Sequence, residues 1–186
     1  NIGLDVIKPG SIGKPMNGME MKIVDLDGRD LPQGEEGEIV LKGPMVMKGY
    51  WNLPEETAQA IKDGWLYTGD IGYVDEDGYF FITDRKKDII IKGGENISPR
   101  VIEEVLYAHP DVSEASVIGI KDKVYGEEIK AFVTLKPGRE TTSEEILEYC
   151  RGKLKKFFVP KEVVILDAMP KTLVGKILKK ELRKMQ

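Results

Sequence analysis

Cysteine and histidine are nearly absent from this chain, which has one of each among its 186 residues. The single cysteine, Cys150, excludes an internal disulfide. The two residues together exclude a zinc site that needs several thiolate or imidazole ligands. Cys150 lies on the apolar face of a predicted helix, and His109 falls at a predicted helix end. We expect both to be structural, and we expect no metal site within this chain.

Long apolar runs and the standard nucleotide loops are also lacking. No stretch approaches the roughly 18 apolar residues that would span a bilayer, so any membrane contact is expected to be peripheral. The single cysteine fits a reducing compartment, and we expect a cytoplasmic protein. Neither G-x-x-x-x-G-K-[ST] nor G-x-G-x-x-G occurs, which excludes the two commonest phosphate loops. A net charge of −4 and the lack of any DNA- or RNA-binding signature argue against a nucleic-acid partner.

Charge is plentiful but unevenly placed. Residues 1–83 hold 7 basic and 15 acidic side chains, whereas residues 84–186 hold 21 basic and 17 acidic ones. The segment 151–186 alone holds 11 basic and 3 acidic residues. The change of sign near residue 84 indicates a domain boundary, and the basic end favours an anionic ligand. A solvated lysine-rich helix would explain the basic end equally well.

The chain as a whole is predicted to be α+β. In its first part, short strands and Asp-Gly turns predict a small distorted β-barrel or sheet. In its second part, helices alternate with strands and predict a compact domain with a three-stranded sheet and helices. The predicted strands are 19–25, 37–43, 78–84, 114–120, 128–135 and 162–166, with a hairpin around 75–78. The predicted helices are 52–61, 98–110, 143–154 and 177–184.

The stretch GWLYTGD, residues 64–70, is the first with residues suited to a ligand. We expect an aromatic-rich strand to end in Thr-Gly-Asp, which would expose the Thr68 hydroxyl and the Asp70 carboxylate together. A carboxylate at a strand end can accept both hydroxyls of a ribose. A plain turn, in which Asp70 bonds nearby backbone, is the alternative.

Two further stretches combine basic residues with glycine. DRKKDIIIKGGENISP, residues 84–99, joins a basic run to an apolar triplet and to the pair Gly93-Gly94, which permits close approach of a ligand to the backbone. PKTLVGKILKKEL, residues 170–182, places Lys176 after a glycine, where it is well suited to contact an anion. A surface hairpin and a lysine-rich helix start are the respective alternatives.

In this order, the three stretches resemble the C-terminal part of the adenylate-forming superfamily. That superfamily contains acyl-CoA synthetases, peptide-synthetase adenylation domains and firefly-type luciferases. GEIVLKGPMVMKGYWNLPEET resembles its Gly-Glu strand and Gly-Tyr-Trp-Asn segment. The other stretches resemble its Thr-Gly-Asp motif, its Asp-Arg linker with a glycine hairpin, and its terminal lysine motif. The resemblance covers the chain from Gly10 onward, and around DRKKD it is greatest to fatty acyl-CoA synthetases, the long-chain-fatty-acid–CoA ligases.

The resemblance implies a domain division and a set of site residues. Residues 1–84 would be the last, β-rich subdomain of a large adenylation domain, 85–88 a hinge, and 89–186 a mobile lid. The implied site residues are Thr68, Asp70 and Arg85 for the nucleotide, Lys176 for catalysis, Lys87 for the pivot, and Gly93 and Gly94 for the pantetheine path of CoA. Asn96 stands where some relatives carry arginine or tryptophan, and no role follows for it.

The implied activity is that of an AMP-forming acyl-CoA synthetase, an acid–thiol ligase. ATP and a carboxylic acid, a fatty acid being favoured, would form an acyl-adenylate, and CoA would then displace AMP after the lid turns. Mg²⁺ would be held by residues outside this sequence. The family's phosphate loop, its aromatic-x-Thr-Glu segment and its acyl pocket do not occur here, so we expect a C-terminal fragment that is inactive alone.

Two other functions stay open at this stage. One is an adenylation domain that serves the phosphopantetheine arm of a carrier protein, with the same lysine and hinge. The other is a non-catalytic binding module whose basic surface docks an acidic partner. In the favoured interpretation the partners are small molecules only: the acid, ATP and CoA.

Overall fold

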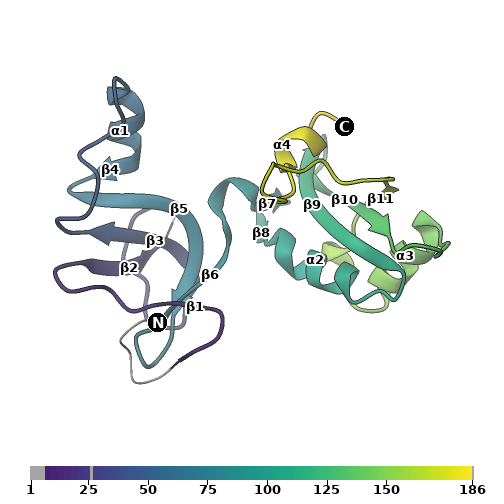
Figure 1. Ribbon diagram of the computed structural model, residues 1–186, viewed down its shortest axis with the longest axis horizontal. Coiled ribbons are helices and arrows are strands. Elements are labelled where there is room, and N and C mark those ends of the chain that lie inside the picture. Colours follow the sequence, from purple (N-terminus) through teal and green to yellow (C-terminus); the bar gives the residue numbers. More distant parts are fainter. Residues whose placement is uncertain (1–6, 26, 186) are drawn as a thin grey trace. The chain divides into compact units, whose positions relative to one another are not determined.

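The computed structural model describes residues 7–25 and 27–185. The chain divides into two compact units, Asn1–Lys87 and Asp88–Gln186, here called the first and the second unit. Each unit has its own sheet (Figure 1). Each also has its own apolar core. Residues 1–6 of the predicted 1–84 domain lie outside the described ranges. Within those ranges, no helix is both long enough and apolar enough to cross a membrane.

The first unit is built on an antiparallel sheet. Its strands are β1 (Ser11–Gly13), β2 (Glu20–Val24), β3 (Gly37–Lys42), β4 (Ile61–Lys62), β5 (Trp65–Val74) and β6 (Phe80–Arg85). Among the described residues their order is β1-β6-β5-β3-β2, with β4 beside β5. Of the two predicted forms, the open sheet is therefore the one observed, and a closed barrel is not.

A tight turn joins β5 to β6 as the sequence predicts. Val74 pairs with Phe80, and the Asp75 carboxylate accepts hydrogen bonds from the backbone N–H groups of Asp77 (3.0 Å) and Tyr79 (2.9 Å). An aspartate that bonds backbone a few residues ahead stabilises a turn locally. The register that follows brings the end of β6 beside the middle of β5, and this pairing positions the candidate site.

The helix of the first unit lies on its surface. It is α1 (Pro54–Ala60), which lies inside the predicted range 52–61 and has Pro54 in its first turn together with Glu55 and Glu56. Proline and acidic side chains suit a helix start, because the first N–H groups are unpaired and partly positive. No residue of α1 is buried.

The second unit confirms the α+β class but has a larger sheet than predicted. Its strands are β7 (Ile90–Lys92), β8 (Glu95–Ile97), β9 (Val112–Asp122), β10 (Gly126–Leu135) and β11 (Glu162–Ile165). The described residues give the order β11-β10-β7-β8, with β9 also paired to β10. The sheet thus has five strands rather than three, because both arms of the glycine hairpin join it. Among the strand pairs that the described residues form here, β10 and β11 are parallel and the others are antiparallel.

Strand β10 separates two apolar cores. Ile129, Ala131 and Val133 belong to a core shared with two helices, whereas Phe132 belongs to a second core with Leu182. Side chains on a strand alternate between the two faces of the sheet, so successive residues enter different cores. The helices are α2 (Pro99–Tyr107), α3 (Ser143–Arg151) and α4 (Lys179–Leu182), and the single-turn 3₁₀ segments are η1 (Lys86–Asp88) and η2 (Lys156–Phe158). Figure 1 shows α2 and α3 together on one side of β9 and β10, with α4 away from them.

The helices of the second unit are shorter than predicted. Ser98 is the N-cap of α2, as expected, and a capping box between Thr142 and Glu145 starts α3. Helix α3 ends at Arg151 before Gly152, and α4 covers four residues instead of the predicted 177–184. Glycine ends helices readily, and the residues before α4 form a turn.

Cys150 and His109 are both buried, as their structural interpretation requires. Burial raises the pKa of the Cys150 thiol to about 11, so the reactive thiolate is scarce at neutral pH. His109 accepts a hydrogen bond at Nδ1 from the backbone N–H of Asp111 (3.2 Å) and packs edge-on against Tyr149. The histidine therefore stabilises the turn after α2.

Candidate functional site

The Thr-Gly-Asp sequence forms a bulge inside β5 and does not end the strand as predicted. Glu38 of β3 pairs with Ile71, but Val40 pairs with Tyr67, so residues 68–70 of β5 face a single residue of β3. Extra residues in one strand of a pair re-aim the side chains around them. The strand continues beyond the bulge to Val74 because pairing with β6 resumes there.

Hydrogen bonds fix the shape of this bulge from within. The Thr68 hydroxyl donates to the carbonyl of Ile39 (2.7 Å) and accepts from the backbone N–H of Asp70 (3.1 Å). The middle residue, Gly69, has a φ of +71°, which other residues rarely adopt. Thr68 thus shapes the backbone that carries the Asp70 carboxylate.

Asp70 and Arg85 are direct partners across β5 and β6. Arg85 Nε lies 2.7 Å from Asp70 Oδ1, and the side chains are 57% and 20% exposed, respectively. A hydrogen bond between a guanidinium and a carboxylate is short and directional, so it fixes how the carboxylate is turned. The structure therefore brings together the three residues that the sequence analysis assigned to the nucleotide: Thr68, Asp70 and Arg85.

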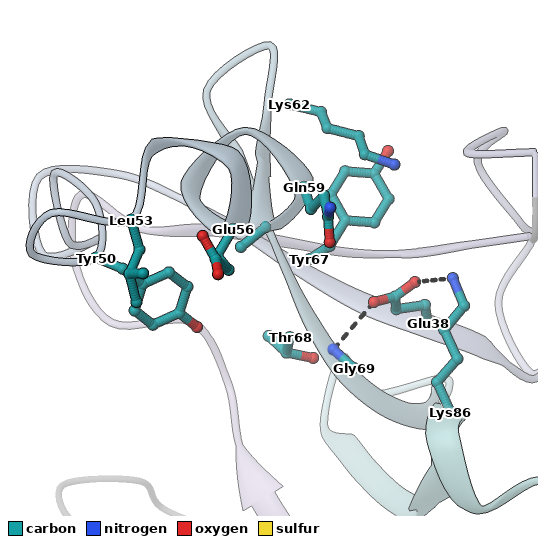
Figure 2. A pocket seen from close by; sticks show the side chains of 11 residues that line it. Glu38, Tyr50, Leu53, Glu56, Gln59, Lys62, Tyr67, Thr68, Gly69 and Lys86 are labelled. Atoms are coloured by element: carbon teal, nitrogen blue, oxygen red, sulfur yellow. Dashed lines mark hydrogen bonds and ion pairs between the residues drawn. The ribbon is translucent and has the colours of Figure 1, made fainter.

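A buried carboxylate that the sequence analysis missed supports the bulge from behind. Glu38 is 4% exposed; its Oε1 accepts from the backbone N–H of Gly69 (3.0 Å) and its Oε2 from Nζ of Lys86 (2.7 Å). Figure 2 shows these two contacts on opposite oxygens of the same side chain. A buried charge is tolerated only when it is paired and hydrogen-bonded. The sequence feature that could have revealed Glu38 is its place as the one acidic residue in the apolar strand sequence GEIVL, residues 37–41.

Two pockets meet at the bulge. The larger has a volume of about 470 Å³ and lies beside α1; its walls include Tyr50, Leu53, Glu56, Tyr67 and the Glu38–Lys86 pair (Figure 2). The smaller has a volume of about 340 Å³ and is lined by Ile12, Lys14, Met16, Met19, Met21, Ile39, Leu41, Thr68, Asp70 and Ile82. Thr68 lines both pockets, whereas Asp70 lines only the smaller one, whose walls are mainly apolar.

The glycine pair of the second unit makes a two-residue hairpin turn. Lys92 pairs with Glu95, and the intervening Gly93 and Gly94 have φ values of +56° and +87°. Two positive φ values characterise the type I′ turn that joins short antiparallel strands. A Cβ on Gly93 would lie 3.1 Å from the ring of Phe157, whereas a Cβ on Gly94 would meet nothing within 4 Å. Gly94 therefore faces open space, and Gly93 is confined by its neighbour.

Lys176 stands on a separate turn of the second unit. Lys171 and Ile177 form an isolated bridge, and the backbone N–H of Thr172 donates to the carbonyl of Lys176 (2.8 Å). The tip residues Leu173 and Val174 are exposed. Within the described ranges, the exposed Lys176 ammonium group makes no ion pair or hydrogen bond. The lysine-rich helix start that was the alternative for residues 170–182 is present at Lys179, and Lys176 precedes it on the turn.

Lys87 lies where the two units divide. It is exposed and sits in the middle of the 3₁₀ turn η1 (Lys86–Asp88). Asn96, for which the sequence offered no role, is an exposed residue of β8 opposite Ile91.

The comparison with protein families agrees with this arrangement. Residues 101–176 match the AMP-binding enzyme C-terminal domain, and residues 3–51 match the AMP-binding enzyme family. The chain belongs to this family of adenylate-forming enzymes and corresponds to its C-terminal part.

The curated relatives are CoA ligases. The long-chain-fatty-acid–CoA ligase of Bacillus subtilis (strain 168) is 51% identical over 176 residues, which cover 94% of this chain and 31% of the relative. A 2-succinylbenzoate–CoA ligase of Geobacillus kaustophilus (strain HTA426) is 46% identical over 178 residues, or 96% of this chain and 36% of the relative. The chain spans about a third of the length of these relatives.

Solved structures show the same fold with related sequences. ATP-bound MatB from Rhodopseudomonas palustris matches with a TM-score of 0.89 and 38% identity, over 95% of this chain and 36% of that one. The o-succinylbenzoate CoA synthetase MenE from Bacillus subtilis, in complex with its acyl-adenylate intermediate, matches with a TM-score of 0.82 and 40% identity, over the same shares.

Proposed function

We propose that this chain is the C-terminal part of an AMP-forming acyl-CoA ligase, called the parent enzyme below. In the first half-reaction, a carboxylate oxygen attacks the α-phosphorus of ATP, and pyrophosphate leaves. In the second, the sulfur of CoA attacks the acyl carbon, and AMP leaves. The observation that carries the proposal is the Asp70–Arg85 pair on its bulge, a rigid carboxylate with the chemistry to hold a ribose.

Asp70, Arg85 and Thr68 would act in nucleotide binding. The Asp70 carboxylate would accept hydrogen bonds from the ribose hydroxyls, while Arg85 fixes that carboxylate through Nε and offers its other N–H groups to the same ribose. Thr68 would act mainly through the bulge, since its hydroxyl already bonds Ile39 and Asp70. A binding group that is already oriented loses little freedom when the ligand arrives.

Lys176 would act in the first half-reaction. That step brings a carboxylate up to a triphosphate, so two anions must approach each other. A lysine at the junction offsets the repulsion and stabilises charge that develops on the α-phosphate. The support is that Lys176 is exposed on a turn and makes no competing ion pair among the described residues.

The second half-reaction would require the second unit to turn about Lys87. Turning would withdraw Lys176 and present the hairpin of Gly93 and Gly94 to the pantetheine arm of CoA. Support comes from the position of Lys87 at the division between the units, and from the open space in front of Gly94. Hinges are a few element-terminal residues that absorb a change in φ and ψ.

Mg²⁺ would be held outside the described residues. MenE from Bacillus subtilis has been solved in complex with ATP and a magnesium ion, and bound Mg²⁺ would supply charge neutralisation at the phosphates. Within the described ranges, no group of three or more His, Cys, Asp or Glu side chains could hold a metal ion. The residues present do not fit such a site.

We propose a fatty acid as the acid substrate, because the relative at 51% identity is a long-chain-fatty-acid–CoA ligase. Relatives at 46–48% identity include 2-succinylbenzoate–CoA ligases, which favour an aromatic dicarboxylic acid as the second candidate. ATP–pyrophosphate exchange by the parent enzyme with both acids decides between them. Activity with 2-succinylbenzoate alone would reject the fatty acid and leave the ligase assignment intact.

Two measurements test the ligase assignment itself. The parent enzyme should release pyrophosphate in the presence of ATP and the acid, and the 186-residue chain alone should not, because the phosphate loop and acyl pocket lie elsewhere. A parent enzyme that forms acyl-adenylate but transfers the acyl group only to a carrier protein's phosphopantetheine arm would establish the carrier alternative. Lys176→Ala with unchanged adenylation and a lost protein contact would favour the binding module.

A further inference from the structure

The residue before Lys87 is tied to the first unit. Lys86 Nζ lies 2.7 Å from Oε2 of Glu38, a residue of β3 that is 4% exposed and also binds the N–H of Gly69. The carboxylate is therefore fixed in the sheet by its second contact. Lys86 follows β6 directly, so the ion pair extends the rigid part of the first unit by one residue beyond the strand.

The residue after Lys87 is tied to the second unit. Asp88 Oδ1 lies 2.7 Å from Nη2 of Arg183, and the two side chains are 13% and 35% exposed. Arg183 directly follows α4, which is itself fixed by the buried Leu182 and by an ion pair of Lys179 with Glu103 on α2 (2.9 Å). A four-residue helix has little stability of its own, so these contacts hold it in place.

We propose that Glu38 and Arg183 are positioning residues that confine the turning of the two units to Lys87. Each backbone residue has two soft dihedral angles. Lys86 is anchored to the first unit and Asp88 to the second, so the change in φ and ψ falls on Lys87. The second unit then follows one defined path between its two working orientations. This inference rests on the proposed two-step function, because that function requires two orientations.

The same anchor links the pivot to the catalytic loop. Helix α4 begins two residues after Ile177, where the Lys176 turn closes, so the Asp88–Arg183 pair joins the pivot to the base of that turn. Positional errors at the pivot grow with distance from it, and a misplacement of about 1 Å can cost on the order of 100-fold in rate. A firm link between pivot and loop keeps the Lys176 position reproducible. The plain alternative is that both ion pairs, each with a largely buried carboxylate, only add stability and do not guide the turning.

Distance distributions between the units test the proposal without catalysis. We would place dyes on Glu76→Cys in the first unit and Lys153→Cys in the second, both exposed positions, and record single-molecule energy transfer on the 186-residue chain. Cys150 can stay, because it is buried and its thiol pKa of about 11 suppresses labelling. The variants are Arg183→Met and Lys86→Met, with Arg183→Lys as the conservative form.

The expected result is a wider distance distribution in both methionine variants, and a width close to the original in Arg183→Lys. Lys184→Met is the matched control, because Lys184 pairs only with Glu181 of the same helix turn in the described residues. Equal widths in all variants would overturn the proposal. If Arg183→Met unfolds, Lys86→Met reports the same confinement from the first unit.

Kinetics of the parent enzyme add a second readout. Arg183→Met should lower kcat of both half-reactions about two- to fivefold, the effect of a weak ion pair, with the KM for ATP unchanged because Asp70 and Arg85 lie in the other unit. A change in the KM for ATP with kcat unchanged would contradict the positioning role. A parent enzyme that forms no acyl-adenylate would contradict the proposed function. The distance distributions would still decide whether the Glu38–Lys86 and Asp88–Arg183 pairs confine the turning to Lys87.

Discussion

Asp70 and Lys176 are the two charged groups on which the proposed chemistry depends, and their surroundings differ: one is held by several partners and the other is exposed. Asp70 lies in a sheet, paired with Arg85 at 2.7 Å and carried by a bulge that three further hydrogen bonds fix. Lys176 stands on an exposed turn of the other unit, and among the described residues its ammonium group has no partner.

The difference follows from what each group would have to do. A carboxylate that binds a nucleotide throughout both half-reactions gains from a fixed orientation, because nothing has to be ordered when the ligand arrives. A lysine that acts in only one half-reaction must leave afterwards, and a strong ion pair within its own unit would compete with its task. Under the proposed function, the contrast would separate a permanent binding group, Asp70, from a mobile one, Lys176.

The largest expected effect is on Lys176. Lys176→Ala in the parent enzyme should slow acyl-adenylate formation on the order of 10²–10³-fold, as loss of a transition-state donor does, with little effect on stability because the side chain is exposed. ATP–pyrophosphate exchange measures this. Lys180→Ala, an exposed lysine on α4, is the control. Similar losses in the two variants would mean that overall charge, and not the position of Lys176, matters.

The next effect concerns Asp70. Asp70→Asn should raise the KM for ATP about 10- to 100-fold, the range expected for lost hydrogen bonds to a charged group, and should lower kcat less. Initial rates at varied ATP measure it, with the exposed Asp167→Asn as control. If KM stays the same and only kcat falls, Asp70 is not a ground-state ligand of the nucleotide, and the contrast with Lys176 disappears.

Glu38 tests whether the bulge is really preorganised. Glu38→Ala leaves the N–H of Gly69 and the ammonium of Lys86 without an acceptor, so the first unit should lose about 1–3 kcal/mol of unfolding free energy. Glu38→Gln should lose less, since its carbonyl oxygen can still accept from Gly69. Trp51 and Trp65 are the chain's two tryptophans and both belong to the first unit, so urea titration by tryptophan fluorescence reports on that unit alone. No difference from the exposed Glu35→Ala would count against preorganisation.

The two glycines of the hairpin turn are expected to give the smallest effects and to differ from each other. Alanine costs about 1–2 kcal/mol at a left-handed position. Gly93→Ala should cost more than Gly94→Ala, because its Cβ also presses on Phe157 at 3.1 Å. Hydrogen exchange of amides in the second unit measures both. Gly94→Val should in addition raise the KM for CoA; an unchanged KM would remove Gly94 from the pantetheine path.

Local patterns predicted much of this fold. The β5–β6 turn was predictable because Asp75 and Gly78 fix it over four residues, and α3 was predictable because its capping box and apolar face are local. The site residues Thr68, Asp70, Arg85 and Lys176 came from motifs that match a family, and the pairing of Asp70 with Arg85 became visible only in the structure.

The features that the sequence did not predict depend on contacts with residues far away along the chain. Glu38 is buried because Lys86 and Gly69, 48 and 31 residues away, satisfy its carboxylate. The bulge at Thr68 depends on pairing with β3, which is distant in the sequence. The sequence of β5 alone therefore predicted that the strand ends at Asp70, whereas it continues to Val74. Strands β7 and β8 have three residues each and join the sheet through β10, which no local pattern specifies.

Lys87→Pro tests the central claim, a joint that turns between two half-reactions, most directly. Proline fixes its own φ and restricts the backbone of the residue before it. The substitution should therefore limit how far the second unit can turn about residue 87. Single-turnover measurements on the parent enzyme would follow acyl-adenylate formation from ATP and then thioester formation from preformed acyl-adenylate. We expect thioester formation to fall much more than adenylation. Equal losses in the two half-reactions would contradict a pivot at Lys87.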